Sequence, residues 1–321
     1  MTDRSDRVIK IATRNSRLAT FQATVVKEEL ESLFPNYKFE LNYVRSEVGD
    51  LNKDKPLADL GLGVFVRSIE QSLLASESDI AVHSLKDVPT ILTEGLEIVA
   101  FLEREDARDV NVSRDNICLK ELPIGARIGT SSPRRAVQIL NMRSDLQIVP
   151  IRGNVPTRVS KIETLECDAV VLAAAGLKRL QLDNHISEYL DIDDFIPAPG
   201  QGIIGVQIRS DDQELFPIVR ALNNVESEVC SKSERKFLEL LGSGCQMPVG
   251  AHARIIKGEL HMISSIGDLN LNKCYVSRVV GQLEKPENLA KETKYDFESR
   301  EAKYLIERYT LCVSIIYRLG K

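Results

Sequence analysis

The chain contains no long hydrophobic run and no closely spaced cysteines. None of its apolar stretches approaches the roughly 18 residues that a membrane-spanning helix needs, and residues 1–7 contain no hydrophobic signal segment. The six cysteines lie far apart without a Cys-x-x-Cys pair, which argues against zinc-ligand spacing and against a disulfide framework. We therefore expect a cytoplasmic protein without a membrane segment or a metal site.

An overall excess of positive charge is also missing, since the formal net charge of the 321 residues is −5. A protein whose main partner is nucleic acid usually carries a basic excess or a basic face, so we expect no nucleic-acid partner. Hydrophobic residues make up 43% of the chain and charged residues 28%, which is typical of a soluble globular protein. The length suits about two or three domains, each with its own core.

Apolar runs and helix-start signals alternate along most of the chain. They predict strands at 8–12, 37–44, 79–82, 96–102, 128–130, 148–151, 169–173 and 203–208, and helices at 16–33, 64–76, 132 onward and 155–165. Residues 49–63 have the composition of a long loop. Further on, the pattern predicts a helix at 226–241, strands at 250–256, 259–265 and 274–280, and a helix at 300–319. This order is typical of an α/β fold with mixed, mostly parallel sheets, followed by a smaller α+β domain.

Two breaks in the pattern suggest where the chain passes between lobes. The dense charge run 104–109 is typical of a hinge, and 197–202 is rich in proline and glycine. We expect domain 1 to comprise 1–102 and 203–222, domain 2 to comprise 103–202, and domain 3 to comprise 223–321. Two α/β lobes that are joined by a hinge form a cleft, which is a common ligand site.

Arginines recur where an expected strand ends and an expected helix begins. They are Arg14, Arg134, Arg135, Arg152, Arg158 and Arg179. Strand ends and helix starts are the places where α/β folds bind ligands, and clustered guanidinium groups favour a ligand with several carboxylates or phosphates. Two arginines at a helix start need a reason, because the helix dipole opposes each by about 0.3–1 kcal/mol. The alternative is that these side chains are solvated and pair with nearby acids.

Asp87 lies in the segment Ala81–Pro89, just past an apolar strand. An acid that is held among cations stays ionised and can stabilise positive charge on a ligand. Ordinary structural roles remain open here: Asp87 as a turn cap, His83 as a hydrogen-bonded packing residue, and Lys86 as an ion-pair partner of Asp87.

Cys245 lies between glycines and a proline, in the segment Leu241–Gly250, which predicts an exposed loop. No base is adjacent in the sequence, so a protease-like Cys–His pair is not supported. A covalent attachment point fits such a thiol better. The other cysteines are expected to be small buried hydrophobic residues.

Together these features resemble the porphobilinogen deaminase (hydroxymethylbilane synthase) family of tetrapyrrole and haem biosynthesis. The matching runs are Ile11–Ser16, Val82–Pro89, Gly129–Arg135, Arg152–Arg158, Leu172–Leu180, Pro199–Gly202 and Gly244–Pro248. The resemblance implies two lobes like those of type II periplasmic binding proteins and a third, smaller domain. It also implies a monomer that joins four porphobilinogen molecules head to tail, releasing ammonia each time. The dipyrromethane cofactor, made from two substrate units, would be attached to Cys245 through a thioether.

The resemblance also implies a role for each matched residue. The implied catalytic residues are Asp87, Lys86, Arg14, Arg152 and Arg158. The implied cofactor-binding residues are Cys245, Ser84, Thr130, Ser131, Ser132, Arg134 and Arg135. The implied substrate-binding residues are Arg14, Ser16, Gln22, Phe65, Arg179 and Gln201.

The chemistry of the substrate agrees with these side chains. Each pyrrole carries an acetate and a propionate, so the growing product is a polyanion that arginines can bind. Loss of ammonia leaves a cationic azafulvene, and a fixed carboxylate would stabilise that charge and assist proton transfer.

One segment departs from the family pattern. Gly61–Phe65 is one residue shorter than usual and lacks a lysine, and Lys53 and Lys55 are the candidates to replace it. A catalytically impaired paralogue is therefore one rival. The other is a non-catalytic anion-binding protein on the same two-lobed fold.

Overall fold

The computed structural model describes residues 8–45, 64–242, 247–300 and 302–308, without the side chains of residues 64 and 65. They belong to two compact units. The first comprises Met1–Glu105 and Gly202–Glu228, and the second Asp106–Gln201 and Val229–Lys321. The finer division into three domains stays a prediction.

The first unit is built on a five-stranded mixed sheet with the order β2-β1-β3-β10-β4. Its strands are β1 (Val8–Thr13), β2 (Lys38–Tyr43), β3 (Ile80–Ser84), β4 (Leu96–Phe101) and β10 (Ile204–Arg209). β1 is parallel to β2 and β3, while β10 is antiparallel to both β3 and β4. Four strands therefore run in one direction and β10 runs in the other.

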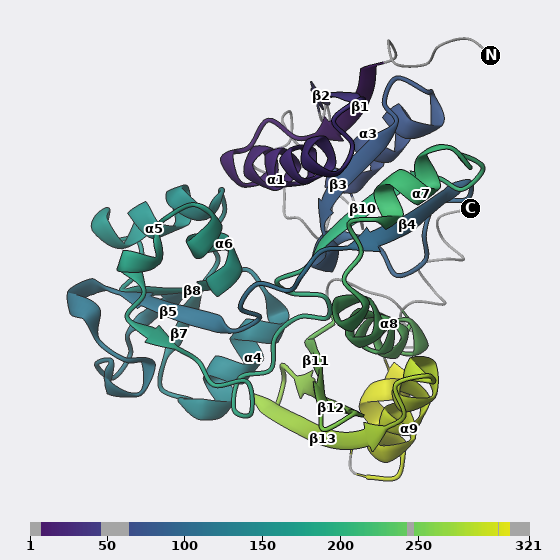
Figure 1. The fold of residues 1–321 in the computed structure, drawn as a ribbon. Helices are drawn as coiled ribbons and strands as arrows, with labels where there is room; N and C mark the ends of the chain where they lie inside the picture. Colours follow the sequence, from purple (N-terminus) through teal and green to yellow (C-terminus); the bar gives the residue numbers. More distant parts are fainter. Residues whose placement is uncertain (1–7, 46–63, 243–246, 301, 309–321) are drawn as a thin grey trace. The chain divides into compact units, whose positions relative to one another are not determined.

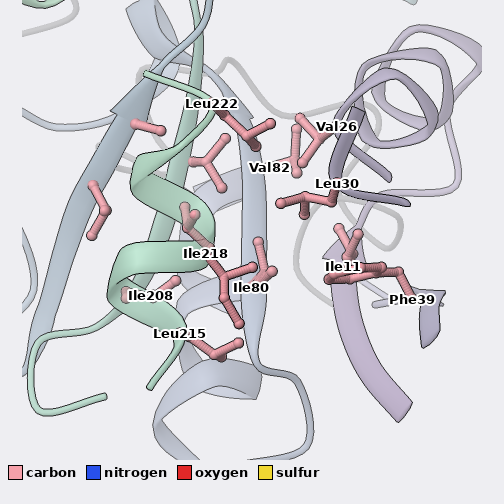
Figure 2. Packing of buried hydrophobic residues seen from close by; sticks show 14 of the residues in the cluster. Ile11, Val26, Leu30, Phe39, Ile80, Val82, Ile208, Leu215, Ile218 and Leu222 are labelled. Carbon is pink, nitrogen blue, oxygen red and sulfur yellow. The ribbon is translucent and has the colours of Figure 1, made fainter. Parts of the chain in front are cut away.

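Helices cover both faces of this sheet. α1 (Arg17–Leu33) and α7 (Leu215–Arg220) bury apolar side chains against one face, where Val26, Leu30 and Ile218 meet Ile80 and Val82 (Figure 2). α3 (Val64–Leu74) packs Ile69 and Leu73 against the other face. Burial of such side chains contributes about 1.5–3 kcal/mol each, so the sheet has an apolar core on both sides.

The second unit contains a sheet of the same design, with the order β7-β6-β8-β5-β9. Its strands are β5 (Asp109–Ser113), β6 (Arg127–Gly129), β7 (Gln147–Val149), β8 (Ala169–Ala173) and β9 (Glu188–Tyr189). β6 is parallel to β7 and β8, and β5 is antiparallel to β8 and β9. Figure 1 shows α5 (Val155–Glu163) and α6 (Ala174–Arg179) on one face and α4 (Pro133–Met142) on the other.

The C-terminal part of the second unit is a three-stranded antiparallel sheet with two helices. Strands β11 (Val249–Ile256), β12 (Glu259–Asp268) and β13 (Lys273–Gly281) share a core with α8 (Val225–Leu240) and α9 (Pro286–Glu298). α4 lies against this sheet too: a Cβ added to Gly267 would be 2.4 Å from a methyl carbon of the buried Val137. The lack of a side chain at Gly267 therefore allows α4 to approach closely.

The expected fold class is confirmed: two α/β lobes with mixed sheets and a separate C-terminal sheet and helix region. The sequence did not predict α7, α9, β9 or strand β5, whose first residue it assigned to a hinge. Of the helix expected at 300–319, residues 303–308 are helical and 309–321 lie outside the described residues. Within the described ranges, no helix is both long and apolar enough to cross a membrane.

Candidate functional site

In the first unit, six of the predicted site residues lie at one edge of the sheet. The carboxyl ends of β1 and β3 and the start of β10 meet there, since Ala12 pairs with Ala81 and Ile204 with Ser84. Residues that follow parallel strands gather at such an edge. The six residues are Arg14, Ser16, Gln22, Ser84, Lys86 and Asp87.

Asp87 ends a 3₁₀ turn, Leu85–Asp87, that follows β3 directly. The backbone N–H of the buried Leu85 donates to the carbonyl of Ile203 at 3.0 Å, and the N–H of Val88 donates to the carbonyl of Leu85 at 3.1 Å. Asp87 itself is exposed and Lys86 is half-buried. The turn is thus anchored through its backbone, and the Asp87 carboxylate is accessible at the sheet edge.

Three smaller polar residues at this edge have internal partners. The Gln22 side chain is buried and exchanges hydrogen bonds of 2.9 and 3.1 Å with the Ser84 hydroxyl. The Ser16 hydroxyl caps α1 by accepting from the N–H of Ala19 at 3.3 Å, as its position predicted. These contacts join α1 to the end of β3, next to Asp87.

In the second unit, the other predicted arginines and hydroxyls lie at the corresponding edge. β6, β7 and β8 end there, and the Ser131 hydroxyl donates to the carbonyl of Ile151 at 2.7 Å, which links two of these strand ends. Ser132 caps α4 by accepting from the N–H of Arg135 at 3.4 Å. The residues at this edge are Thr130, Ser131, Ser132, Arg134, Arg135, Arg152 and Arg158, with Arg179 in the last turn of α6.

Arg134 and Arg135 are both buried, with a common partner in Asp109. Arg134 Nη2 lies 2.7 Å from Asp109 Oδ2. Arg135 donates to Asp109 Oδ1 from Nε at 3.1 Å and from Nη2 at 2.7 Å. Asp109 is 0% exposed, and the arginines are 4% and 6% exposed. The alternative expectation was that these arginines are solvated and pair with nearby acids. The pairing with an acid is observed, but both side chains are buried and not solvated.

Gln201 belongs to the same buried cluster. Its amide group donates to Asp109 Oδ1 at 3.0 Å and to the carbonyl of Ala107 at 2.8 Å. Asp109 was not among the site residues predicted from the sequence. The one signal for it was its place as the acid that begins the run Asp109–Val112. Because β5 is antiparallel to β8, its first residue lies opposite Ala173, at the edge where β8 ends.

The charges of this cluster leave one positive charge, since two guanidinium groups face one carboxylate. Burial lowers the pKa of Arg134, and the charge of Asp109 raises it again in part. Arg134 also donates to the carbonyl of Ile196 at 2.6 Å. The start of α4 therefore combines a net cationic cluster with the Ser132 hydroxyl, which accepts from Arg135 and can still donate, and both favour a carboxylate-bearing group.

Two predicted site residues have no described side chain. Phe65 belongs to α3 by its backbone alone. Cys245 lies outside the described residues, as do Lys53, Lys55 and Gly61.

The second unit also contains a cavity of about 590 Å³ away from the predicted site. Ser113, Arg114, Glu163, Leu165 and His185 contribute to its lining. Ser113 ends β5 opposite Ala169, where β8 begins. The cavity is therefore at the opposite edge of the sheet from Arg134, Arg135 and the other predicted site arginines.

Two family models match the chain. "Porphobilinogen deaminase, dipyromethane cofactor binding domain" matches residues 9–216, and "Porphobilinogen deaminase, C-terminal domain" matches residues 229–298. Relatives named porphobilinogen deaminase include one from Chloroherpeton thalassium, 45% identical over 81% of this chain and 83% of its own. Another, from Syntrophobacter fumaroxidans, is 41% identical over 94% of this chain and 98% of its own.

Solved structures show weaker likenesses. The VFT2 domain of Bordetella pertussis BvgS has a TM-score of 0.42 at 17% identity, covering 67% of this chain and 86% of that one. The methionine-binding protein MetQ has a TM-score of 0.42 at 10% identity, covering 67% of this chain and 89% of that one. The family is established by the sequence matches instead: the chain belongs to the porphobilinogen deaminase family, whose members are enzymes that carry a dipyrromethane cofactor.

Proposed function

We propose that Asp87 is the catalytic carboxylate of this family's reaction, the head-to-tail condensation of four porphobilinogen molecules. Its carboxylate would stabilise the positive charge that develops on a pyrrole when ammonia leaves, and would assist the following proton transfer. Lys86, Arg14, Arg152 and Arg158 would act with it.

The observation that carries this proposal is the exposure of Asp87 on an anchored turn. Its neighbours Leu85 and Val88 are buried and their N–H groups are hydrogen bonded, while Asp87 is exposed. A charge that is fixed before the reaction stabilises a transition state without reorganisation. Arg14 follows β1 at the same edge, where it suits a carboxylate of the substrate.

The residues at the start of α4 suit the cofactor. Two pyrroles bear acetate and propionate groups, and the net positive charge of Arg134 and Arg135 with Asp109, beside the Ser132 hydroxyl, would favour these carboxylates. Ser131 would support the same helix start through its hydrogen bond to Ile151. Thr130 and Ser84 would complete the set, and Cys245 would be the attachment point. When bound, dipyrromethane supplies the pyrrole to which the first substrate is joined.

Further assignments belong to the same proposal. Ser16, Gln22, Phe65, Arg179 and Gln201 would contribute to binding porphobilinogen. Gln22 and Gln201 are buried and hydrogen bonded internally, so they would act by holding Ser84 and Asp109 in place. The protein would be a cytoplasmic monomer.

The experiment combines intact mass with turnover. The purified protein should exceed its sequence mass by two pyrrole units, with Cys245 as the modified residue. Asp87→Asn should keep the fold and the added mass but lose most turnover. Asp211→Asn, an exposed aspartate in the same unit, should turn over normally. An unmodified Cys245 after incubation with porphobilinogen contradicts the attachment, and near-normal turnover of Asp87→Asn removes Asp87 from the catalytic role.

A further inference from the structure

A buried chain of hydrogen bonds lies within the first unit and includes His83, on the strand that leads into the turn with Asp87. His83 Nε2 is 3.0 Å from Gln207 Oε1, and Gln207 Nε2 donates to Glu70 Oε1 at 3.0 Å. The Thr93 hydroxyl donates to Glu70 Oε2 at 2.7 Å. His83, Gln207 and Glu70 are 5%, 0% and 4% exposed. Three polar side chains are thus brought together inside an apolar unit, where each needs a partner.

The direction of each bond follows from Glu70. A carboxylate only accepts hydrogen bonds, so the amide nitrogen of Gln207 must face it. The amide oxygen of Gln207 then faces His83 and needs a donor, so His83 carries its proton on Nε2. Its Nδ1 is left with a lone pair. The network therefore selects one of the two neutral imidazole tautomers.

Burial favours the same neutral form. Burial lowers the pKa of His83, while its hydrogen bond to Gln207 and the charges of Glu70 and Asp87 raise it to a smaller extent. His83 is thus a neutral donor whose orientation is set by its partners.

The backbone around Gln207 is irregular at the position that the network requires. Val206 pairs with Ala100 but Gln207 pairs with Ile98, so the register between β10 and β4 shifts at this step. Such irregularities often re-aim a side chain near a functional site. On its other side β10 pairs regularly with β3, where Gly205 is opposite His83 and Ile204 is opposite Ser84. With this shift, Gln207 donates to Glu70 on α3 while β10 stays paired with the end of β3.

We propose that Glu70, Gln207 and His83 form a positioning network that holds the end of β3, so that the following turn presents the Asp87 carboxylate to the reacting pyrrole. His83 is four residues from Asp87 and directly precedes Ser84, the last residue before the turn. The network ties β3 to α3, through Glu70, and to β10, through Gln207. This inference rests on the catalytic role proposed for Asp87.

Replacement of His83 tests the network by kinetics. His83→Leu removes the donor to Gln207 and should lower kcat about 10- to 100-fold, because a small displacement of a catalytic group costs this much. KM should change less than twofold, and the cofactor mass should remain. His83→Gln places an amide nitrogen near the position of Nε2 and should recover most of kcat. Ser72→Ala is the control. Ser72 is on α3, as is Glu70, and the variant removes its buried 2.9 Å hydrogen bond with Ser78. It should leave kcat unchanged.

The tautomer of His83 provides a readout that does not depend on any variant being active. The chain has four histidines, and the ¹⁵N signals of His83 are those that disappear in His83→Gln. They should show the Nε2–H tautomer in the wild-type protein, and Glu70→Gln should mix the two tautomers and lower kcat. An Nδ1–H or protonated His83 in the wild-type protein overturns the proposal, as does normal kcat in His83→Leu. If Asp87→Asn turns over normally, the catalytic role of Asp87 fails instead.

Discussion

Asp106 shows how a single charged residue in the second unit depends on its neighbours. Burial alone would raise the pKa of this carboxyl, but hydrogen bonds from Arg108 and the charges of Arg108 and Lys178 lower it to about 2. The shortest contact joins Arg108 Nη2 to Asp106 Oδ2 at 2.7 Å, and Lys178 Nζ is 3.4 Å from the same oxygen. Asp106 follows the first point where the chain passes between the units.

The depressed pKa predicts a dependence of stability on pH. A carboxyl with a lowered pKa stabilises the fold above its unfolded value, near 3.8, and this contribution is lost as the pH falls toward 2. Asp106→Asn should therefore lower the free energy of unfolding by about 1–2 kcal/mol at pH 7, and by less as the pH falls from 4 to 2. Urea unfolding across this range measures the difference, with Asp211→Asn as the control. A difference that is the same at pH 7 and pH 2.5 would contradict the assignment.

The positions of the site residues could be predicted at this scale, but their partners could not. Strand ends and helix starts are local patterns, so Arg134 and Arg135 were found at the start of α4. Their partner Asp109 is 25 or more residues away along the chain, and its place depends on β5 entering the sheet antiparallel. A single sequence does not encode that direction in any local pattern. The same holds for Glu70 and Gln207, which are 137 residues apart.

At the scale of elements, the sequence predicted those that have local signals. The helices expected to start at residues 16 and 132 do begin there, capped by Ser16 and Ser132, with Pro133 in the first turn of α4. β5 was missed because two of its residues, Asp109 and Asn111, are polar although they are buried. Asp109 pairs with Arg134 and Arg135, and Asn111 donates to the carbonyl of Ile117. α9 was missed although Pro286 begins it. Its buried side chains complete the core of the three-stranded sheet, and that core is formed by residues far apart in sequence.

Glu234 joins two elements of the second unit and allows a test at this scale. Its carboxylate on α8 accepts from the N–H of Gly200 at 2.7 Å and from the N–H of Ala253 on β11 at 2.7 Å, and it is 0% exposed. Glu234→Ala would leave two buried N–H groups without this acceptor, at about 1–3 kcal/mol each. The expected loss of unfolding free energy is therefore about 2–6 kcal/mol, measured by chemical denaturation.

The control lies on the same helix. Glu226 is exposed in the first turn of α8, so Glu226→Ala should cost less than about 1 kcal/mol. Equal losses in the two variants would show that the Glu234 contacts do not hold these elements together.

At the scale of the whole molecule, the chain passes from the first unit to the second after Glu105 and returns at Gly202. These two residues are in contact: the N–H of Glu105 donates to the carbonyl of Gly202 at 3.2 Å. Gly202 has φ +89°, and a Cβ added there would lie 2.2 Å from the carbonyl oxygen of Glu105. The crossing segments thus approach one another so closely that only glycine fits.

Gly202→Ala should therefore separate the two segments and lower the free energy of unfolding by at least about 3 kcal/mol, since a left-handed backbone is combined with a clash against backbone. Gly258→Ala is the matched control, because Gly258 has φ +84° but nothing within 4 Å of an added Cβ, and it should cost about 1–2 kcal/mol. Thermal unfolding and turnover are measured on both variants. A larger effect in Gly202→Ala on both quantities would show that this contact holds the Asp87 turn as well, because Leu85 donates to Ile203, the residue next to Gly202. Equal effects would mean that the backbone at Gly202 relaxes freely and that the close approach does not constrain the crossing.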